Sequence, residues 1–429
     1  MKIEISRQNN LSGEIKVPGD KSISHRAVIL SSLARGQSRI RGFLESEDCL
    51  HTVEIFRQLG IKINKQKKGV YTVSGSGLDG LQEPQSVLDC GNSGTGMRIL
   101  TGLLSAQSFY SVLTGDKSLC QRPMERIISP LEQMGAQIWS RRGGMAPLSV
   151  RGQKLAPLNY ELPVASAQVK SSLIMAGLAS GEPLTITEPG FSRDHTERML
   201  KNSGVPLDKE KLTISLPGGR YKLTPLDIKI PGDISSAAFF IAAALITENS
   251  SIILKNVGLN PTRSGFLEVI DKMGGSIDIL NKRKTAGEPV GDLQVKSSSL
   301  SGIEIRGDII PRLIDEIPVI AVLAARAEGR TLIRDAEELR VKETDRIEAM
   351  VNELSKMGVS IAEYEDGMII EGPSDLQKGD LFRSYGDHRV AMSLAVAGLC
   401  RKKKMTITNC ECINTSFPEF EEVLAELIN

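Results

Sequence analysis

The sequence has few of the features that mark metal sites, disulfide frameworks or membrane proteins. Its six cysteines are scattered without a C-x-x-C pair, and its four histidines lie far apart along the chain. This spacing gives no sign of a metal site and is typical of reduced thiols in a cytoplasmic protein. No apolar run reaches about 18 residues, and residues 1–6 lack the apolar core of a signal peptide. We therefore expect a cytoplasmic protein with no membrane-spanning helix.

An excess of charge of one sign is also missing. The 53 Lys and Arg residues nearly balance 52 Asp and Glu residues, which leaves a formal net charge of +1 over 429 residues. The strongly basic surface that binds nucleic acid is therefore not expected. With 40% hydrophobic residues, the composition is that of an ordinary globular enzyme of two or three domains.

Nucleotide-binding patterns are absent as well. Lys21-Ser22 resembles the end of a P-loop, but the spacing G-x-x-x-x-G-K-[ST] is not met, which disfavours nucleotide-dependent phosphoryl transfer. The glycines of residues 91–96 do not follow G-x-G-x-x-G, so a Rossmann site is not expected. The pair Cys410 and Cys412 lacks further zinc ligands and is interpreted as structural.

What the sequence does contain is a sixfold internal repeat. Each unit begins with a turn of small residues and continues as a helix rich in Ala, Leu and Ile. The six units begin near Gly19, Gly91, Ala165, Gly232, Arg312 and Gly386. Because these first helices, such as the one expected over Ser24–Leu33, are apolar on nearly every face, we expect them to be buried.

A second, amphipathic helix is predicted in every unit. The six predicted ranges are Cys49–Leu59, Pro123–Met134, His195–Asn202, Ser264–Met273, Thr344–Met357 and Pro418–Leu427. Most of these helices are followed by a glycine, which suits the left-handed residue that ends many helices. Two alternating strands follow five of the six, as in residues 359–370.

The sixth unit has no strand pair after its last helix, and the N-terminus can supply one. Residues 1–6 and 13–17 are predicted to form a hairpin joined by a turn at Asn9-Asn10. The sequence therefore predicts an α/β protein of two domains, each with three repeated units, buried inner helices and outer sheets. One domain comprises 1–19 and 232–429, the other comprises 20–231, and two Pro-Gly crossovers join them.

Polar residues gather where the inner helices begin. These residues include Lys21, Ser22 and Arg26, the segment 91–98, and Ser166 to Gln168. The N-terminus of a helix carries partial positive charge and unpaired N–H groups, so it favours anions. If the two domains face each other, six such ends meet in one cleft, and the active site is expected there.

Further charged residues lie at the starts of later helices. Asp315 and Glu316 are expected inside the otherwise apolar fifth inner helix, and Lys342 and Arg346 are spaced to share one helical face. Each of these signals also has a structural interpretation: Asp315 can be a helix cap, and residues 340–346 can be a solvated, self-paired helix start. Their equivalent places in the repeat favour the functional interpretation.

Together, these motifs resemble those of the 5-enolpyruvylshikimate-3-phosphate (EPSP) synthase family, especially its second, more divergent class. The resemblance covers essentially all of the chain. The matching segments are PGDKSISHR (18–26), GNSGTGMR (91–98), RPMER (122–126), SRDHTE (192–197), PGDISSAAFF (231–240), LIDEIP (313–318), LRVKETDR (339–346), GDHRVAM (386–392) and TSFPEF (415–420). The resemblance implies two inverse α/β domains hinged by two crossovers, which agrees with the repeat.

The resemblance also implies the chemistry. Members of the family move the enolpyruvyl group of phosphoenolpyruvate to the 5-hydroxyl of shikimate 3-phosphate and release phosphate, through a tetrahedral intermediate and without a cofactor. Shikimate 3-phosphate is expected at Lys21, Ser22, Arg26, Ser166, Ala167, Gln168, Arg193, Asp315 and Lys342. Phosphoenolpyruvate is expected at Lys21, Gly94, Arg122, Gln168, Arg346 and Arg389. The resemblance implies small-molecule substrates, no nucleic-acid or membrane partner, and a monomer. The family is a target of glyphosate, and Gly94 favours sensitivity in this chain although the divergent class often tolerates the inhibitor.

The expected mechanism needs a base near the 5-hydroxyl and an acid near the methylene carbon. Asp315 is the predicted base, and either Glu343 or Lys21 is the acid. Two features depart from the family pattern. Thr415 occupies a position where many members have Lys, and Gly94 leaves space for glyphosate although the divergent class often has Ala there.

Two alternatives stay open at this point. A UDP-N-acetylglucosamine enolpyruvyl transferase shares the fold but usually has a loop cysteine where this chain has Lys117. A non-catalytic scaffold that only binds anions is the second alternative, and the presence of Lys21, Asp315, Glu343 and Arg346 argues against it.

Overall fold

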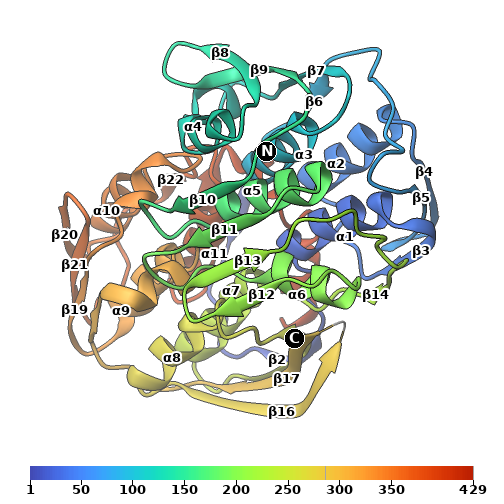
Figure 1. The fold of residues 1–429 in the computed structure, drawn as a ribbon. Coiled ribbons are helices and arrows are strands. Elements are labelled where there is room, and N and C mark those ends of the chain that lie inside the picture. Colours follow the sequence, from blue (N-terminus) through green and yellow to red (C-terminus); the bar gives the residue numbers. More distant parts are fainter. Residues whose placement is uncertain (286, 429) are drawn as a thin grey trace. The chain divides into compact units, whose positions relative to one another are not determined.

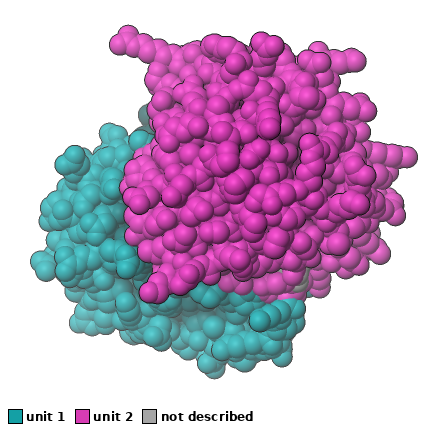
Figure 2. Space-filling view, viewed as in Figure 1, with its two compact units in different colours: residues 1–18, 231–284, 289–429 teal, residues 19–230, 285–288 magenta. Residues whose placement is uncertain are grey.

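The computed structural model describes residues 1–285 and 287–428, and the chain divides into two compact units (Figure 2). Unit 1 comprises Met1–Pro18, Pro231–Lys284 and Pro289–Asn429, and unit 2 comprises Gly19–Ile230 with Thr285–Glu288. The predicted division at 19/20 and 231/232 differs from these bounds by one residue at each crossover. It also assigned Thr285, Gly287 and Glu288 to the discontinuous domain, whereas they belong to unit 2.

Six inner helices form the centres of the two units (Figure 1). In unit 2 they are α1 (Lys21–Leu33), α3 (Gly94–Ser105) and α5 (Ala167–Ser180). In unit 1 they are α7 (Ile234–Ile246), α9 (Ile317–Arg326) and α11 (His388–Gly398). In α7 every residue from Ile234 to Leu245 is buried, as the all-round apolar sequence predicts.

Inner helices of one unit pack closely on each other. α3 lies against α5, and a Cβ at Gly102 of α3 would come within 2.0 Å of the Ser172 carbonyl oxygen of α5. Only glycine fits that approach. In unit 1, α11 packs against both α7 and α9.

An amphipathic outer helix follows each inner helix along the chain. These are α2 (Glu47–Gln58), α4 (Glu125–Gln133), α6 (His195–Asn202), α8 (Gly265–Lys272), α10 (Arg346–Lys356) and α12 (Phe420–Glu426). Several predicted outer helices were one to two residues too long at an end. The glycines after α2, α4, α6, α8 and α10 all have positive φ, and those five predicted stops are confirmed.

Within residues 1–285 and 287–428 each unit has three sheets, and five of the six share one strand order. A leading strand pairs with the strand after the inner helix, and the two strands after the outer helix complete the sheet. In unit 2 the orders are β6-β7-β9-β8, β10-β11-β13-β12 and β14-β3-β5-β4. In unit 1 they are β18-β19-β21-β20, β16-β17-β15-β2 and the three-stranded β1-β23-β22.

The strands themselves are short. In unit 2 they are β3 (Arg35–Arg41), β4 (Lys62–Lys67), β5 (Val70–Ser76), β6 (Leu88–Asp89), β7 (Tyr110–Thr114), β8 (Gln137–Arg141), β9 (Met145–Arg151), β10 (Leu158–Glu161), β11 (Leu184–Thr187), β12 (Asp208–Glu210), β13 (Thr213–Leu216) and β14 (Asp227–Lys229). In the other unit they are β1 (Lys2–Ile5), β2 (Ser12–Ile15), β15 (Ser251–Gly258), β16 (Ser276–Thr285), β17 (Glu288–Lys296), β18 (Glu304–Ile305), β19 (Gly329–Ile333), β20 (Ser360–Tyr364), β21 (Gly367–Gly372), β22 (Leu381–Arg383) and β23 (Met405–Thr408).

The predicted N-terminal hairpin is wrong. β1 pairs with β23, with Ile3 opposite Ile407, whereas β2 lies in another sheet and pairs in parallel with β15. β1 therefore completes the sixth sheet alone, and β2 leads the fourth. The alternating pattern of both strands is the same in a hairpin and in separate sheets, so it could not distinguish the two arrangements.

Each unit has its own hydrophobic core, built from the inner helices and the inward faces of its sheets. In unit 1, Phe239, Phe240, Phe417 and Phe420 pack ring against ring, with centroids 5.7–6.3 Å apart, and join α7 to α12. Among the described residues, no helix combines the length and the apolar character that a membrane crossing requires.

Candidate functional site

In unit 2, α1 begins three residues earlier than predicted. Asp20 caps the helix, because its Oδ1 accepts from the backbone N–H of Ile23 at 2.8 Å. Lys21 and Ser22 therefore lie in the first turn, where backbone N–H groups are unpaired. The Nζ of Lys21 forms an ion pair with the buried carboxylate of Asp48.

Arg26 is buried, at 4% exposure, and its guanidinium connects three helices of unit 2. Its Nε donates to Thr196 Oγ1 at 2.6 Å and its Nη2 donates to Ser171 Oγ at 2.9 Å. Its Nη1 donates to the carbonyl of Ser22 at 2.9 Å. Burial and the charges of Lys21 and Arg26 lower the pKa of His25 well below its ordinary value, so that imidazole is neutral.

The segment before α3 holds a second arginine. Ser93 caps the helix through the N–H of Gly96 at 3.0 Å. Arg122 donates from Nη2 to Asn92 Oδ1 at 2.7 Å and from Nη1 to the Asn92 carbonyl at 3.3 Å. A Cβ on Gly94 would lie 3.6 Å from Nη1 of Arg122, so the backbone of Gly94 and this guanidinium are neighbours.

Arg98 lies in the segment 91–98 but was not assigned to a substrate. Its Nη1 donates to Gln168 Oε1 at 2.6 Å, and Gln168 Nε2 donates to Thr95 Oγ1 at 2.9 Å. These bonds tie the start of α3 to the start of α5, which Ser166 caps. Both Thr95 and Arg98 belong to the segment 91–98, so the motif contained the signal, but their partner Gln168 lies 73 and 70 residues away.

The remaining predicted residues of unit 2 lie near these. Ala167 is the first residue of α5, and Arg193 lies in the loop before α6; both are half-buried. The structure thus brings the starts of α1, α3, α5 and α6 together through direct hydrogen bonds. The result is a surface that carries four basic side chains, Lys21, Arg98, Arg122 and Arg193, and helix N-termini, which suits an anionic ligand.

In unit 1, the structure corrects two predictions. Asp315 and Glu316 do not lie inside the fifth inner helix, because α9 begins at Ile317. Lys342 and Arg346 do not share a helical face, because a 3-10 helix ends at Val341, Lys342 is extended and α10 begins at Arg346. The sequence pattern therefore identified the correct residues but did not show that they precede the helices α9 and α10 or lie at the first residue of α10.

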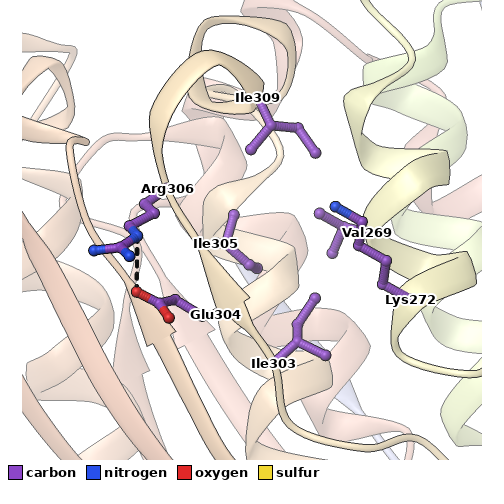
Figure 3. Close-up of a pocket in the computed structure, with 7 residues that line it drawn as sticks. All are labelled: Val269, Lys272, Ile303, Glu304, Ile305, Arg306 and Ile309. Atoms are coloured by element: carbon purple, nitrogen blue, oxygen red, sulfur yellow. Dashed lines mark ion pairs between the residues drawn. The ribbon is translucent and has the colours of Figure 1, made fainter.

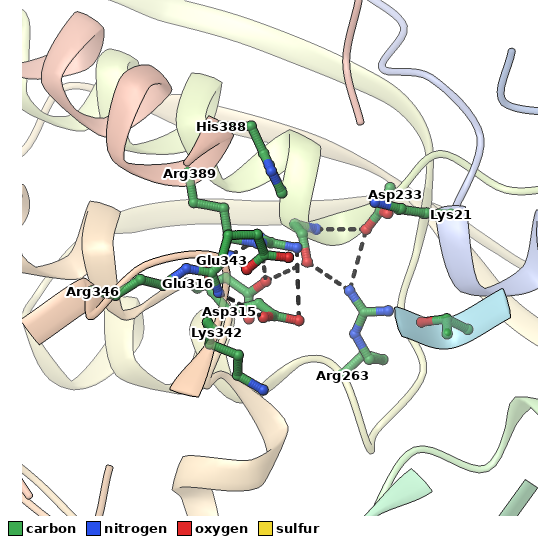
Figure 4. Close-up of polar contacts among 12 residues, drawn as sticks. Lys21, Asp233, Arg263, Asp315, Glu316, Lys342, Glu343, Arg346, His388 and Arg389 are labelled. Atoms are coloured by element: carbon green, nitrogen blue, oxygen red, sulfur yellow. Dashed lines mark hydrogen bonds and ion pairs between the residues drawn. The ribbon is translucent and has the colours of Figure 1, made fainter. Parts of the chain in front are cut away.

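Arg346 lies at the centre of the cluster in unit 1, and only 1% of its side chain is exposed. Its Nη2 pairs with Glu343 Oε2 at 2.6 Å and its Nη1 with Asp315 Oδ1 at 3.2 Å (Figure 4). Its Nε pairs with Asp387 Oδ2 at 2.7 Å. Burial lowers the pKa of Arg346, but the three carboxylates outweigh it and hold the pKa above its ordinary value. The guanidinium is therefore a permanent cation that fixes both predicted catalytic carboxylates.

Arg389 lies beside the same carboxylate. Its Nη1 donates to the Asp315 carbonyl at 3.1 Å, and its Nη2 is 3.6 Å from Asp315 Oδ2. Asp387 positions it, because Asp387 Oδ1 accepts from the N–H of Arg389 at 2.8 Å as the cap of α11. Asp315 thus faces two guanidinium groups.

Glu316 and Arg263 extend the cluster (Figure 4). The sequence had placed Glu316 beside Asp315 but had assigned neither Glu316 nor Arg263 to a substrate. Glu316 is buried, accepts a short hydrogen bond from Ser235, and lies 3.8 Å from Arg389 Nη1. Arg263 donates to Ser235 Oγ at 2.6 Å and pairs with Asp233 at 3.2 Å. Burial raises the pKa of Glu316, although the charges of Arg263 and Arg389 oppose that rise.

The predicted ligand Lys342 and the divergent position Thr415 are more peripheral in unit 1. Lys342 is 27% exposed and pairs with Glu338 at 3.5 Å. Thr415, at the place of the usual lysine, lies 3.4 Å through Oγ1 from Nδ1 of His388. Thr415 adds no cation, so in this chain the basic residues of this cluster are Arg263, Lys342, Arg346 and Arg389.

A hollow of about 200 Å³ beside α8 holds none of these residues (Figure 3). Four of its seven lining residues are isoleucine or valine, and the charge of Arg306 is paired with Glu304 at 2.9 Å. Its lining does not suit a doubly anionic ligand. Among residues 1–285 and 287–428, no group of three His, Cys, Asp or Glu side chains is placed to hold a metal ion.

Each unit therefore has its own cluster with its own chemistry. The cluster of unit 2 offers cations and helix N-termini for anions. The cluster of unit 1 offers two guanidinium groups beside carboxylates, which can take up or give up protons next to a bound anion.

Comparison with known proteins bears on the function. The family model described as EPSP synthase, 3-phosphoshikimate 1-carboxyvinyltransferase, matches residues 5–424. A 3-phosphoshikimate 1-carboxyvinyltransferase of Brevibacillus brevis is 51% identical over 426 residues, which are 99% of each chain. One of Petrotoga mobilis is 50% identical over 429 residues, covering 100% of this chain and 99% of its own.

Solved structures agree. An EPSP synthase from Acinetobacter baumannii superimposes with a TM-score of 0.88 at 46% identity, and the match covers 99% of this chain and 98% of that one. The enolpyruvyl transferase NikO from Streptomyces tendae has a TM-score of 0.79 at 19% identity, covering 99% and 96%. At 19% identity, the similarity to NikO supports only the fold.

Proposed function

The chain belongs to the EPSP synthase family, and from this membership we propose that its two residue clusters together bind and convert one pair of substrates. Enolpyruvyl transfer to shikimate 3-phosphate, a step of the shikimate pathway, is the activity of the chain. The earlier expectation of this family and fold is confirmed. The roles of individual residues are the proposal.

The observation that carries the proposal is the buried Arg346 and its carboxylates. A buried arginine that binds Asp315, Glu343 and Asp387 at once presents an acid and a base beside a cation. Enolpyruvyl transfer requires this combination, since a proton must leave the 5-hydroxyl and another must reach the methylene carbon next to an anionic donor.

For shikimate 3-phosphate we propose Ser22, Arg26, Ser166, Ala167, Gln168, Arg193 and Lys342, with Lys21 and Asp315 at its reacting end. For phosphoenolpyruvate we propose Lys21, Gly94, Arg122, Gln168, Arg346 and Arg389. Arg matches phosphate and carboxylate groups through paired N–H donors. Since each list draws on both units, the proposal requires both clusters to contact the same substrates.

In the proposed mechanism Asp315 accepts the proton of the 5-hydroxyl while that oxygen attacks C2 of phosphoenolpyruvate. Glu343 or Lys21 donates a proton to C3, which gives a tetrahedral intermediate. Loss of a C3 proton and departure of phosphate then restore the double bond. Exclusion of water would protect the intermediate. A monomer that works in the cytoplasm without nucleic-acid or membrane partners is part of the same proposal.

The decisive experiment measures phosphate release from phosphoenolpyruvate with shikimate 3-phosphate, with UDP-N-acetylglucosamine, and with no acceptor. We expect release only with shikimate 3-phosphate. Release only with the sugar nucleotide would favour the alternative transferase. Binding of shikimate 3-phosphate without any release would favour a non-catalytic scaffold.

A further inference from the structure

The hexapeptide SRDHTE (192–197) is held by its side chains to an unusual extent. Ser192 donates a short hydrogen bond to Glu188, and Asp194 pairs with Arg198 Nε at 2.9 Å. The next three residues, at the start of α6, contact three different elements. His195 Nδ1 lies 2.8 Å from Glu288 Oε1, Thr196 accepts from Arg26, and Glu197 pairs with Lys170. Arg193 is the residue of this segment that we assign to shikimate 3-phosphate.

Lys170 is the central member of this network. Its ammonium is fully buried and pairs with Glu188 Oε2 at 2.8 Å and Glu197 Oε1 at 2.7 Å. The side chains of these glutamates are only 0% and 4% exposed. Lys209 lies 3.9 and 4.0 Å from the same oxygens, so two cations balance two carboxylates. Of these two lysines, Lys170 makes the shorter ion pairs with both glutamates.

The two glutamates bracket Arg193 in the chain. Glu188 follows β11 and holds the segment before Arg193 through Ser192, while Glu197 holds the segment after it within the first turn of α6. Lys170 itself lies on α5, two residues beyond Gln168. One ammonium therefore fixes both ends of the Arg193 loop to the helix that carries other proposed ligands.

We propose that Lys170 is a positioning residue for shikimate 3-phosphate, which holds the loop of Arg193 in its binding geometry through Glu188 and Glu197. The inference rests on the proposed function of Arg193. A buried ion pair adds little net stability over an apolar replacement of the whole group, so a role in geometry accounts better for its presence. Removal of the ammonium would leave two buried carboxylates with Lys209 alone, at 3.9 and 4.0 Å, and their mutual repulsion would separate them.

The test is a double-mutant cycle with Lys170→Met, Arg193→Ala and both together, read as KM for each substrate. A mispositioned charge-assisted contact costs roughly tenfold in KM for shikimate 3-phosphate. We expect this rise in Lys170→Met, with KM for phosphoenolpyruvate changed less than about twofold. We expect the double variant to match Arg193→Ala, because Lys170 acts through Arg193. Additive effects, or equal rises in both KM values, would overturn the proposal.

Arg401→Met is the matched control, since Arg401 is another fully buried cation but, among the described residues, contacts no proposed substrate-binding segment. It binds the carbonyls of Leu376, Lys378 and Gly379 and lies 3.7 Å from Asp380 Oδ1. The variant should lower the thermal midpoint and leave KM for shikimate 3-phosphate unchanged. If Lys170→Met does not fold, Ser192→Ala tests the proposal instead, because it breaks only the link between Glu188 and the loop of Arg193. We expect it to raise KM for shikimate 3-phosphate by less than the roughly tenfold expected of Lys170→Met. An unchanged KM for shikimate 3-phosphate would overturn the proposal. Wild-type protein that lacks acceptor-dependent phosphate release would instead overturn the proposed function.

Discussion

Replacement of Asp315 by Asn separates the two roles that the structure gives this carboxylate. Asp315 is the proposed base, and it is also a partner of Arg346 at 3.2 Å and of Arg389 at 3.6 Å. Asn keeps the shape but cannot accept the hydroxyl proton. Loss of a general base costs roughly 10²- to 10⁴-fold in kcat, or about 2.7–5.4 kcal/mol.

The matched control is Asp387→Asn. Asp387 is fully buried and binds Arg346 at 2.7 Å, a shorter contact than that of Asp315, and it has no proposed proton-transfer role. Loss of a charge-assisted hydrogen bond costs about 1.5–3 kcal/mol. If only the position of Arg346 mattered, Asp387→Asn would be the more damaging variant. We expect it to raise KM for phosphoenolpyruvate, with less effect on kcat than Asp315→Asn has.

The assay is steady-state phosphate release with both substrates varied, together with a binding titration of shikimate 3-phosphate. For Asp315→Asn we expect kcat to fall by the stated factor while shikimate 3-phosphate still binds. A kcat near that of the wild type would refute the assignment of the base. A larger loss of kcat in Asp387→Asn would show that Arg346, and not Asp315, accounts for the rate.

Three further variants test other parts of the two clusters. Gly94→Ala places a Cβ 2.9 Å from Arg98 Nη1. Because that guanidinium can shift, we expect a cost in inhibitor binding of about 1 kcal/mol, the low end of the overpacking range, measured as roughly fivefold weaker glyphosate inhibition. Wild-type protein that glyphosate does not inhibit, together with no effect of the variant, would contradict this prediction. Arg122→Ala should raise KM for phosphoenolpyruvate by roughly 10- to 150-fold and leave KM for shikimate 3-phosphate nearly unchanged, and equal rises would contradict its assignment. Burial raises the pKa of Glu316, so the folded state binds more protons than the unfolded one and loses stability as pH rises above the ordinary value of 4.5. In Glu316→Gln, thermal midpoints measured from there toward neutral pH should fall less steeply than in the wild type, and an identical slope would count against a protonated Glu316.

The sequence predicted the elements better than their partners. The six inner helices and six outer helices were all located, because an all-round apolar pattern and a glycine stop are properties of the local chain. The strands between each inner and outer helix were missed. β3, for example, has only Ser38 and Ile40 buried among seven residues, so its alternation is weak. The N-terminal hairpin was wrong because two strands can have the same local pattern in one sheet or in two.

The same limit applies to the candidate site. Lys21, Asp315 and Arg346 stood out through their places in the repeat, and the resemblance to the EPSP synthase family assigned roles to them and to Arg122 and Arg389. Arg98 and Arg263 were not selected, since their importance depends on partners that are 70 and 28 residues away. Lys170 was not selected from the sequence, because only the fold brings it to Glu188 and Glu197.

The repeated Gly-Asp turn explains how one local signal organises much of the cluster in unit 1. Asp20, Asp233 and Asp387 each follow a glycine and each cap an inner helix, with Oδ1 accepting from a backbone N–H at 2.8–2.9 Å. To cap a helix in this way, the carboxylate uses only one oxygen, or only one lone pair of that oxygen, to accept from the backbone N–H. In unit 1 the remaining capacity binds a buried arginine: Asp233 pairs with Arg263 at 3.2 Å and Asp387 with Arg346 at 2.7 Å. The residue that starts the helix thus also fixes the guanidinium beside its positive end, where an anion is best bound. A capping Ser or Thr would start these helices equally well but could not offset the charge of a buried arginine, which is why Asp387→Ser should keep the start of α11 and still weaken phosphoenolpyruvate binding.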